Sequence, residues 1–447
     1  MSELPVGWVE TTIGEICAMG PKSAWDDGME IGFVPMSHAP TNFRGQLNYE
    51  ARRWHEIKKA YTHFENDDVI FAKVTPCFEN GKAALVAGLP NGAGAGSSEF
   101  HVLRRRDAGI SPSYLLAVIK SAQFLREGEE NMTGAVGLRR VPRAFVENFP
   151  VRLPPEAEQK RIAQKLDELL AQVDTLKARI DAITALLKRF RQSTLAAAFS
   201  ARLTGEAPAE FDHWQEAKFS SVIEDLRYGT AQKCDYNGGT TGVLRIPNIG
   251  DRGIVLSDMK SSDFSETEIK KLELMKGDIV LIRSNGSVEL VGKSAVVSEK
   301  EQGLLFAGYL IRIRVDQARS IPEFVNYWLK SPAIRQVIEQ IARSTSGVNN
   351  INSDEIKSLT FTFPSLSAQA EIVRRVEQLF ACADQLEAKV ATVQQRIDGL
   401  TQSLLAKAFS GELVPQNPSD EPASVLLERV RAQRPAAPKP KRGRKKV

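Results

Sequence analysis

The sequence contains two copies of one long segment, and this internal repeat constrains the fold more than any other feature of the chain. The copy that starts at Glu158, EQKRIAQKLDELL, aligns without a gap with the copy that starts at Ala368, AQAEIVRRVEQLF, a shift of 210 residues. The match continues to its end, where QSTLAAAFS from Gln192 aligns with QSLLAKAFS from Gln402. The regions that precede the two copies resemble each other only faintly. The chain therefore reads as variable region, shared segment, variable region, shared segment.

Each shared segment is predicted to form one long helix. Its apolar residues alternate at spacings of four and three, the 3.5-residue period of a coiled-coil seam. Proline precedes both segments, and Gly205 and Gly411 follow them, as expected for helix starts and ends. Two separate amphipathic helices on globular cores are the alternative, but such helices average about three turns. The seam residues are Ile162, Leu166, Leu169, Val173, Leu176, Ile180, Ile183, Leu187 and Phe190 in the first segment, and Ile372, Val376, Leu379, Ala383, Leu386, Val390, Val393, Ile397, Leu400 and Leu404 in the second.

The order of the chain fixes how two such helices can pair. The second variable region follows the end of the first helix and precedes the start of the second. If the helices pair along their whole length they must be antiparallel, and each, at roughly 40 residues, would be about 60 Å long. We therefore expect a rigid rod with one variable domain at each end and an approximate two-fold axis across it.

The variable regions carry the pattern of α+β domains. Short apolar runs separated by glycine-rich turns predict strands, and two other runs predict helices at Pro112–Gln123 and Pro322–Gln340. The predicted fold class is α+β, with two α/β domains separated by two long helices that form an antiparallel coiled coil with pseudo-two-fold symmetry. The strand-like runs are IGFVPM from Ile31, DVIFAKV from Asp68, VLRIPNI from Val243, DIVLIRS from Asp278 and YLIRIRV from Tyr309.

Five consecutive parts follow from these patterns. We expect the first domain over residues 1–153, the first long helix over 154–204, the second domain over 205–363 and the second long helix over 364–415. Residues 416–447 end in a basic, proline-rich sequence that cannot form a core, so we expect a disordered tail. Such a tail could attract phosphates nonspecifically or could only aid solubility.

The net charge of +4 conceals an uneven distribution. Residues 429–447 carry nine of the basic side chains and no acidic one, so the rest of the chain is net acidic. Nucleic acid would therefore have to bind through local basic patches. No stretch approaches the about 20 apolar residues of a membrane helix, and the start MSELPVGWVE lacks the pattern of a secretory signal. We expect a cytoplasmic protein without a membrane partner.

No pattern in the sequence predicts catalysis or a bound metal. The four cysteines and five histidines are scattered and do not fall at metal-ligand spacings. The run VGKS at Val291–Ser294 lacks the glycine that a phosphate-binding loop carries five residues before Gly292. The run Asn417-Pro418-Ser419 lacks the aromatic residue that would stack on a flipped adenine. We expect no catalytic residue, no metal and no cofactor on this chain.

Two domains at a fixed separation suit a ligand with two sites, such as duplex DNA with its repeat of about 34 Å. Polar loops follow apolar strands at matching places in both domains, and their side chains are of the types that read bases or contact phosphates. Any one residue could instead belong to a solvated turn, but the recurrence of both loops favours binding. The candidate DNA-binding residues are Lys73, Thr75, Asn80, Lys82, Thr133, Arg139, Arg140 and Arg143 in the first domain, and Arg283, Asn285, Ser287, Lys293, Ser346, Asn349 and Asn350 in the second.

Several segments resemble the specificity subunits of type I restriction–modification enzymes, and the likeness covers nearly the whole chain. They are the start LPVGWVETTIGEI, the helical segments LPPEAEQKRIAQKLDELLAQVD and AEIVRRVEQLFACAD, and the helix ends LKRFRQSTLAAAFSARLT and LTQSLLAKAFSGELV. The resemblance implies a non-catalytic subunit whose two target-recognition domains each read one half of an asymmetric, gapped DNA sequence, with the helices setting the spacer. It also implies two methyltransferase subunits and two restriction subunits as partners. S-adenosylmethionine, ATP and magnesium would belong to those partners.

Two other functions fit parts of the pattern. A single-chain enzyme that cleaves or methylates DNA itself would need a further catalytic domain, for which the 447 residues leave no room. A coiled-coil scaffold that bridges two protein partners without reading DNA would need the helices alone. The salt dependence of DNA binding separates this scaffold from a specificity subunit, because each neutralised phosphate adds to the slope of log affinity against log salt.

Overall fold

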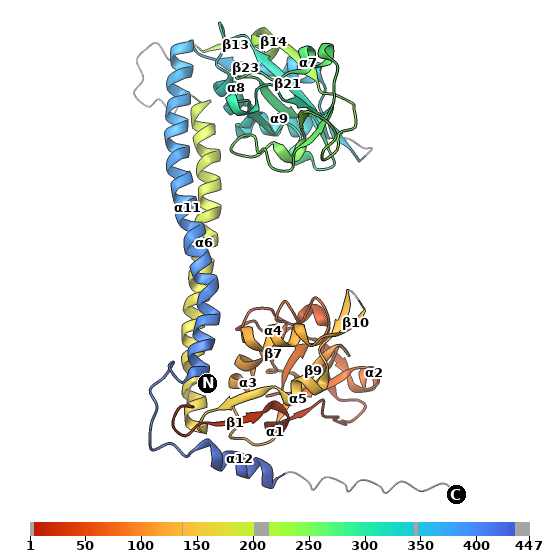
Figure 1. Cartoon of the computed structure of the whole chain (residues 1–447), viewed down its shortest axis with the longest axis vertical. Coiled ribbons are helices and arrows are strands. Elements are labelled where there is room, and N and C mark those ends of the chain that lie inside the picture. The colour runs from red at the N-terminus through yellow and green to blue at the C-terminus, as the bar shows by residue number, and fades with distance from the viewer. Residues whose placement is uncertain (1–3, 136, 201–213, 344–346, 434–447) are drawn as a thin grey trace, which may run out of the picture. The chain divides into compact units, whose positions relative to one another are not determined.

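The computed structural model describes residues 4–135, 137–200, 214–343 and 347–433. The chain divides into two compact units, each holding one variable domain together with part of each long helix (Figure 1). Unit 1 comprises Met1–Ile180 and Thr392–Val447, and unit 2 comprises Asp181–Ala391. None of the helices within the described ranges is long and apolar enough to cross a membrane.

The domain of unit 1 contains two four-stranded sheets. Its elements are β1 (Val9–Thr12), α1 (Ile13–Ile16), β2 (Cys17–Met19), β3 (Glu30–Val34), β4 (Glu50–Arg53), α2 (Trp54–Ile57), β5 (Thr62–Glu65), β6 (Val69–Ala72), β7 (Ala83–Leu85), β8 (Ala93–Gly96), β9 (Phe100–Arg105), α3 (Pro112–Ile119), α4 (Ala122–Glu130), β10 (Thr133–Ala135), β11 (Leu138–Arg140), α5 (Arg143–Asn148) and β12 (Pro150–Leu153). One sheet has the order β2–β9–β6–β7 and the other β4–β3–β8–β5, in which β3 and β8 are parallel. Helix α3 packs on β6 and β7, and β1 pairs with β12 where the domain begins and ends.

The domain of unit 2 repeats this plan. Its elements are β13 (Gln215–Lys218), β14 (Ile223–Tyr228), β15 (Thr241–Leu244), β16 (Lys260–Ser262), α7 (Glu266–Leu272), β17 (Ile279–Ile282), β18 (Ser284–Asn285), β19 (Ser294–Val296), β20 (Leu305–Phe306), β21 (Leu310–Val315), α8 (Pro322–Lys330), α9 (Pro332–Ala342), β22 (Asn349–Asn350), α10 (Ser353–Ser358) and β23 (Thr360–Phe363). The order β14–β21–β17–β19 matches the first sheet of unit 1, and the parallel pair β15–β20 matches β3–β8. The strands predicted at Ile31, Asp68, Val243, Asp278 and Tyr309 form β3, β6, β15, β17 and β21.

Each of the two predicted domain helices is in fact two helices. The helix expected at Pro112–Gln123 divides into α3 and α4, and the one expected at Pro322–Gln340 divides into α8 and α9. Ser121 and Ser331 stand at the breaks with extended backbones, where they start the following helices. Each hydroxyl donates to a carbonyl oxygen of the preceding turn at 2.7 Å. A residue that starts a helix in this way cannot also continue one.

The two long helices run antiparallel, which confirms the predicted pairing. Helix α6 spans Glu156–Ala198 and α11 spans Leu366–Ser410. In unit 1, Lys177 of α6 forms an ion pair with Asp398 of α11 at 3.0 Å, and in unit 2, Arg191 pairs with Asp384 at 2.6 Å. Advancing along α6 therefore means going back along α11, as the connectivity of the chain requires.

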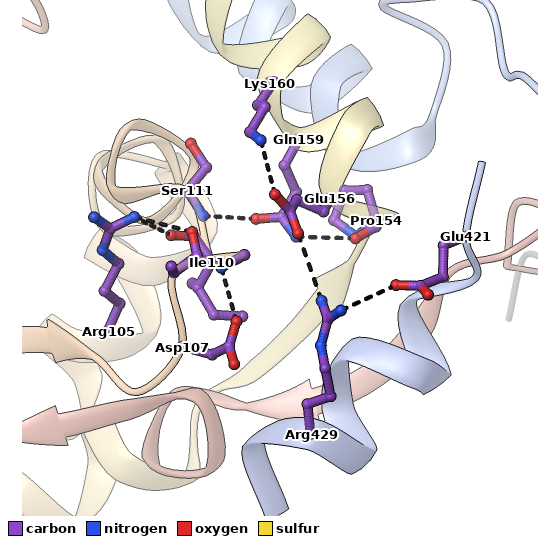
Figure 2. Close-up of polar contacts among 12 residues, drawn as sticks. Arg105, Asp107, Ile110, Ser111, Pro154, Glu156, Gln159, Lys160, Glu421 and Arg429 are labelled. Carbon is purple, nitrogen blue, oxygen red and sulfur yellow. Dashed lines mark hydrogen bonds and ion pairs between the residues drawn. The ribbon is translucent and has the colours of Figure 1, made fainter. Parts of the chain in front are cut away.

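The same glutamine locks the start of each long helix onto its domain. In unit 1, the Gln159 side chain accepts from the Ser111 amide at 2.9 Å and donates to the Pro154 carbonyl oxygen at 3.0 Å (Figure 2). In unit 2, Gln369 accepts from the Ile321 amide at 2.9 Å and donates to the Pro364 carbonyl oxygen at 3.0 Å. Both side chains are fully buried, so these bonds are shielded from water. This explains why a polar residue is identical in the two shared segments.

A helix lies within the segment that we expected to be a disordered tail. Over Ala423–Ala432 the chain forms α12, which packs on unit 1. Leu426, Leu427 and Val430 are at most 5% exposed, and the Ala423 amide donates to the Gly7 carbonyl oxygen at 2.8 Å. The prediction for residues 416–447 was therefore wrong over α12, because three apolar residues on one helical face outweigh the charged residues around them. The basic residues from 434 onward lie outside the described part of the chain.

Ion pairs fasten α12 as well. Arg429 pairs with Glu156 at the start of α6 at 3.5 Å and with Glu421 at 3.4 Å (Figure 2). Arg161 of α6 pairs with Asp420 at 2.6 Å. The C-terminal segment of the chain therefore contacts both the domain and the first long helix within unit 1.

Candidate nucleic-acid interface

The two polar loops predicted in each domain come together in the structure. In unit 2, β18 pairs antiparallel with β22, so that Ser284 lies opposite Asn350 and Asn285 opposite Asn349. In unit 1, an isolated bridge joins Val74 to Arg140, at positions equivalent to Ser284 and Asn350. We call this short pairing the loop ladder of each unit.

The backbone of the ladder is the same in both units. The Lys73 amide donates to the Glu99 carbonyl oxygen, and its equivalent Arg283 donates to the Tyr309 carbonyl oxygen, each at 2.9 Å. The carbonyl oxygens of Lys73 and Arg283 in turn accept from the amides of Val141 and Ile351 at 2.8 and 2.9 Å. The repeat has therefore kept the main-chain framework that presents these loops, while the side chains on it differ.

Arg283 is a cation of the unit 2 ladder whose side chain contacts neutral groups. Its guanidinium donates from Nε and Nη2 to the Asn350 side-chain oxygen at 3.2 and 3.1 Å and lies 4.7 Å from the centre of the Tyr228 ring. Within the described ranges, no carboxylate forms an ion pair with it. Neutral partners thus hold the guanidinium in place and leave its charge available to an anion or to a base edge.

Amides complete the unit 2 ladder. Asn349 donates to the Gly286 carbonyl oxygen at 2.9 Å, and the Asn285 side chain accepts from the Ser287 amide at 2.8 Å. Lys293 forms an ion pair with Asp251 at 2.7 Å, so it is set apart from the ladder. Ser346 lies outside the described residues.

The three candidate arginines of unit 1 are paired with acids. Arg140 donates twice to Glu99, at 2.9 and 2.8 Å, and these bonds hold the pKa of the Glu99 carboxyl below its usual range. Arg143 pairs with Glu147 at 2.8 Å, one helical turn away. Arg139 lies 3.8 Å from Glu79, at the limit of an ion pair. The candidate arginines of unit 1 therefore carry less uncompensated charge than Arg283 of unit 2.

The other residues predicted in unit 1 shape its loops. The Thr75 hydroxyl donates to the Arg139 carbonyl oxygen at 3.3 Å, which ties the two loops together. Lys73 and Lys82 donate to the carbonyl oxygens of Ser98 and Met36 at 2.8 and 3.0 Å. The Asn80 amide donates to the Pro76 carbonyl oxygen at 3.1 Å within the first loop, and Thr133 is exposed in β10.

Two equivalent lysines, the buried Lys120 and the half-buried Lys330, donate to carbonyl oxygens of neighbouring loops, and sequence reasoning missed their role. Lys120 donates to the carbonyl oxygens of Thr41 and Gly81 at 3.0 and 2.9 Å, and its equivalent Lys330 donates to that of Asp251 at 3.1 Å. Burial lowers the pKa of the Lys120 ammonium to about 7 and that of Lys330 to about 8. Their identity in the two domains was a usable signal. Tyr228, which lies 55 residues before Arg283, gave no such signal.

The long helices carry exposed apolar residues at equivalent positions. Leu176, Ile183 and Phe190 of α6 are 41%, 39% and 39% exposed, and Leu386, Val393 and Leu400 of α11 are 45%, 40% and 39% exposed. These six belong to the predicted seam, of which Ile162, Leu166, Ile372 and Val376 are fully buried. Each helix thus buries one part of its seam and leaves a stripe with a seven-residue period open.

Unit 1 also contains a cavity of about 420 Å³ where α11 meets α3 and β12. Its lining from α11 includes Gln402, Leu405 and Phe409, and from the domain Tyr114 and Arg152. The three α11 residues recur unchanged in the first shared segment as Gln192 and Leu195 of α6 and Phe199 directly after it. In the part of the chain that the structure describes, no cluster of three or more histidine, cysteine or acidic side chains could hold a metal ion.

Comparison with known proteins places these features in a family context. The family model of the type I restriction modification DNA specificity domain matches residues 5–185 and 212–395. The chain is 35% identical over 346 residues to the type I restriction enzyme EcoKI specificity subunit of Escherichia coli (strain K12), covering 75% of this chain and 74% of the relative. It is 36% identical over 355 residues to the StySPI specificity subunit of Salmonella potsdam, covering 77% and 76%.

Two solved structures share the fold. A chain from a study of complex assembly and conformational transition of the type I R-M system superposes with a TM-score of 0.70 at 18% identity, covering 92% of this chain and 100% of that chain. The HsdS subunit of Thermoanaerobacter tengcongensis superposes with a TM-score of 0.57 at 19% identity, covering 92% and 98%. Two mixed α/β domains joined through long paired helices are therefore an established architecture.

Proposed function

The chain belongs to the specificity subunits of type I restriction–modification enzymes, and from this premise we propose that its domains read the two unlike halves of one gapped DNA target. Specificity subunits are the non-catalytic part of these enzymes, whose complexes carry the methylase and restriction activities. Here each half-site would meet one loop ladder, and the paired helices would set the length of the unread spacer.

The observation that carries this proposal is the recurrence of the loop ladder with different side chains. A shared backbone framework presents the reading residues in the same way in both units. On it, Arg139 and Arg140 in unit 1 stand where Asn349 and Asn350 stand in unit 2. Arginine favours guanine and asparagine favours adenine when they bind base edges in the major groove. Two equal frameworks with unlike donors suit a target whose halves differ.

The helices are the proposed docking sites of the partner subunits. A two-stranded coiled coil that leaves an apolar stripe open on each helix can accept further helices along those stripes. The exposed apolar stripe of α11 and the α11 residues that line the cavity both recur in the first shared segment. Two similar surfaces suit two copies of one partner, which we take to be the methyltransferase subunit. The two restriction subunits would complete the complex. S-adenosylmethionine, ATP and magnesium would be bound by these partners.

The alternative is a scaffold that bridges two proteins without reading DNA. The environment of Arg283 speaks against it, since a cation held by an amide and an aromatic ring is poised for a ligand with negative or hydrogen-bond-accepting groups. A scaffold would gain nothing from such an arrangement in unit 2.

Methylation mapping tests the proposal. DNA free of adenine methylation is treated with the complex of this chain and its methyltransferase subunit, and every modified adenine is located. We expect all modified sites to share two defined blocks of bases separated by a constant number of undefined bases. Modification without such a two-block pattern, or a complex whose DNA affinity does not fall with salt, would contradict the proposal.

A further inference from the structure

Two large apolar side chains stand in solvent beside the two ladders. Leu138 at the start of β11 is 52% exposed, and Val348 immediately before β22 is 55% exposed. They are equivalent residues, separated by the same 210 positions as the long helices. Each is followed directly by the residues proposed to read DNA, Arg139 in unit 1 and Asn349 in unit 2.

The residue that precedes each of them is also the same. Gly137 and Gly347, which precede them, have left-handed backbones with φ of 83° and 87°. Among the described residues, the chain neighbours of each glycine aside, nothing lies within 4 Å of where a Cβ would stand on either glycine, so close packing against them does not explain the glycines. The left-handed conformation does, because it is costly for residues with a side chain. Both domains have thus kept a left-handed glycine directly before an exposed aliphatic residue.

A single exposed apolar residue is ordinary on a protein surface. Three shared properties set this pair apart, namely the position, the exposure and the preceding left-handed glycine. Around them the side chains of the ladders have changed in both charge and hydrogen-bonding type. An aliphatic group can neither donate nor accept a hydrogen bond, so its contribution to binding comes from leaving water.

The neighbouring residues indicate what covers these side chains. Arginine and asparagine on both strands of the ladder match the donor and acceptor pattern of a DNA groove. Aliphatic residues in such a groove contact the C5-methyl group of thymine or enter a step between two bases. In both cases the ligand is the apolar surface of a base.

We propose that Leu138 and Val348 are the apolar base-contacting residues of the two half-sites. Each enters a groove beside its ladder and buries its side chain against a base of the half-site that its own unit reads. This inference rests on the proposed function and adds to it one residue per half-site that determines specificity without hydrogen bonding.

The test uses the complex of the full chain with its methyltransferase subunit, carrying Leu138→Ser or Val348→Ser. Binding is measured at one salt concentration to duplexes with the intact target or with either half-site scrambled. We expect each variant to bind the intact target about tenfold more weakly, from the burial of one aliphatic side chain. On the duplex with its own half-site scrambled, each variant should bind like the unchanged protein. Leu138→Val should keep most of the affinity.

Met275→Ser is the matched control. Met275 is 48% exposed and precedes β17, at the opposite end of that strand from Arg283. The Met275→Ser complex should bind both half-sites with the affinity of the unchanged protein. Two further measurements identify the base surface that is contacted. If the side chain contacts a thymine methyl group, replacing that thymine with deoxyuridine should remove the difference in affinity between the variant and the unchanged protein. If the side chain enters a base step, a thymine at that step should react with permanganate in the complex of the unchanged protein and not in that of the variant.

The outcomes separate this inference from the proposed function. Full affinity of both serine variants overturns the inference. A loss of DNA affinity that does not depend on which half-site is intact also overturns it. So does a loss that accompanies dissociation of the methyltransferase subunit, since the residues would then contact that subunit. If the unchanged complex fails to distinguish intact from scrambled half-sites, the proposed function itself fails.

Discussion

Unit 1 and unit 2 share a backbone plan but differ at one pair of equivalent residues, Gly109 and Arg319. In unit 1, α12 lies against the domain, and a Cβ on Gly109 would come within 2.8 Å of the Leu426 side chain. In unit 2, the residue equivalent to Gly109 is Arg319, whose guanidinium donates to the Ser221 carbonyl oxygen. A glycine that admits a helix in one unit is thus replaced by a long side chain that makes its own contact in the other.

The comparison shows which parts of a duplicated domain are held fixed. The buried glutamines at the helix starts, the lysines Lys120 and Lys330 and the backbone of the ladders are the same in both units. The side chains that face outward, and the way each domain is covered, have diverged. Positions that satisfy buried backbone groups are constrained by the fold, whereas the outward positions are free to follow the ligand.

Exchanging the residue at the α12 contact should have the largest effect on stability. Gly109→Arg forces a bulky side chain against Leu426 and should destabilise unit 1 by about 3 kcal/mol, as expected when a close-packed contact is overfilled. Calorimetry should show a lower unfolding temperature, and proteolysis should open the chain near α12. The reciprocal Arg319→Gly in unit 2 should cost about 1 kcal/mol or less. Equal losses would mean that α12 does not depend on the glycine.

The arginines of the two ladders should differ in their importance for binding. Arg283→Met should weaken recognition of one half-site by about 2 kcal/mol, the worth of a good base or phosphate contact. Arg140→Met combined with Glu99→Gln, which leaves no carboxylate unpaired, should cost about 0.5 kcal/mol, because Glu99 already neutralises Arg140. Titrations with each half-site scrambled measure both values. A larger loss for the Arg140 variant than for the Arg283 variant would show that Arg140, and not Arg283, is the more important of the two for binding.

The two buried glutamines should instead behave alike. Gln159→Ala and Gln369→Ala each leave a buried amide and a buried carbonyl group unpaired, at a cost of about 2 kcal/mol in their own unit. Hydrogen exchange of each helix start reports the loss. Gln164→Ala, on an exposed position of α6, is the control. A large effect in one unit and none in the other would break the equivalence of the helix starts.

The smallest effect concerns Glu158, whose counterpart in unit 2 is Ala368. Burial raises the pKa of the Glu158 carboxyl, although the Trp8 indole donates to it at 3.0 Å. A raised pKa in the folded state means that the unfolded chain releases this proton first, so stability falls as pH rises through the raised pKa. Glu158→Gln keeps an acceptor for Trp8 and should flatten this fall, which leaves the variant more stable than the unchanged protein at neutral pH. Unfolding curves between pH 4 and 8 test it, and a steeper fall in the variant would contradict the assignment.

Much of this architecture could be predicted from the sequence because the repeat supplied two readings of each feature. The heptad spacing from Ile162 to Phe190 predicted the helix, and connectivity predicted its antiparallel partner. The recurrence of the polar loops marked them as candidates for binding but did not predict that they pair with each other. What escaped prediction depends on single contacts. The packing of Leu426 was hidden beside a basic tail, and the contact between Arg283 and Tyr228 joins strands far apart in the sequence.

The breaks within the domain helices were missed for a related reason. Apolar periodicity continues through Ser121 and Ser331, so a pattern search sees one helix. The break comes from a hydroxyl that bonds to its own preceding turn, and serine makes this bond only where the surrounding packing favours an extended backbone. The side-chain partners at the ladders were likewise decided by tertiary packing and not by local sequence.

A chimeric chain tests the central claim most directly. Residues 9–153, which β1 and β12 close into one domain, are replaced by residues 215–363, which β13 and β23 close in the same way. The transplanted copy carries Arg319→Gly so that α12 can still pack. If each domain reads its own half-site, methylation mapping of the chimera with its methyltransferase subunit will return a target in which both halves are the sequence read by unit 2. Retention of the original half-site of unit 1 would contradict the account.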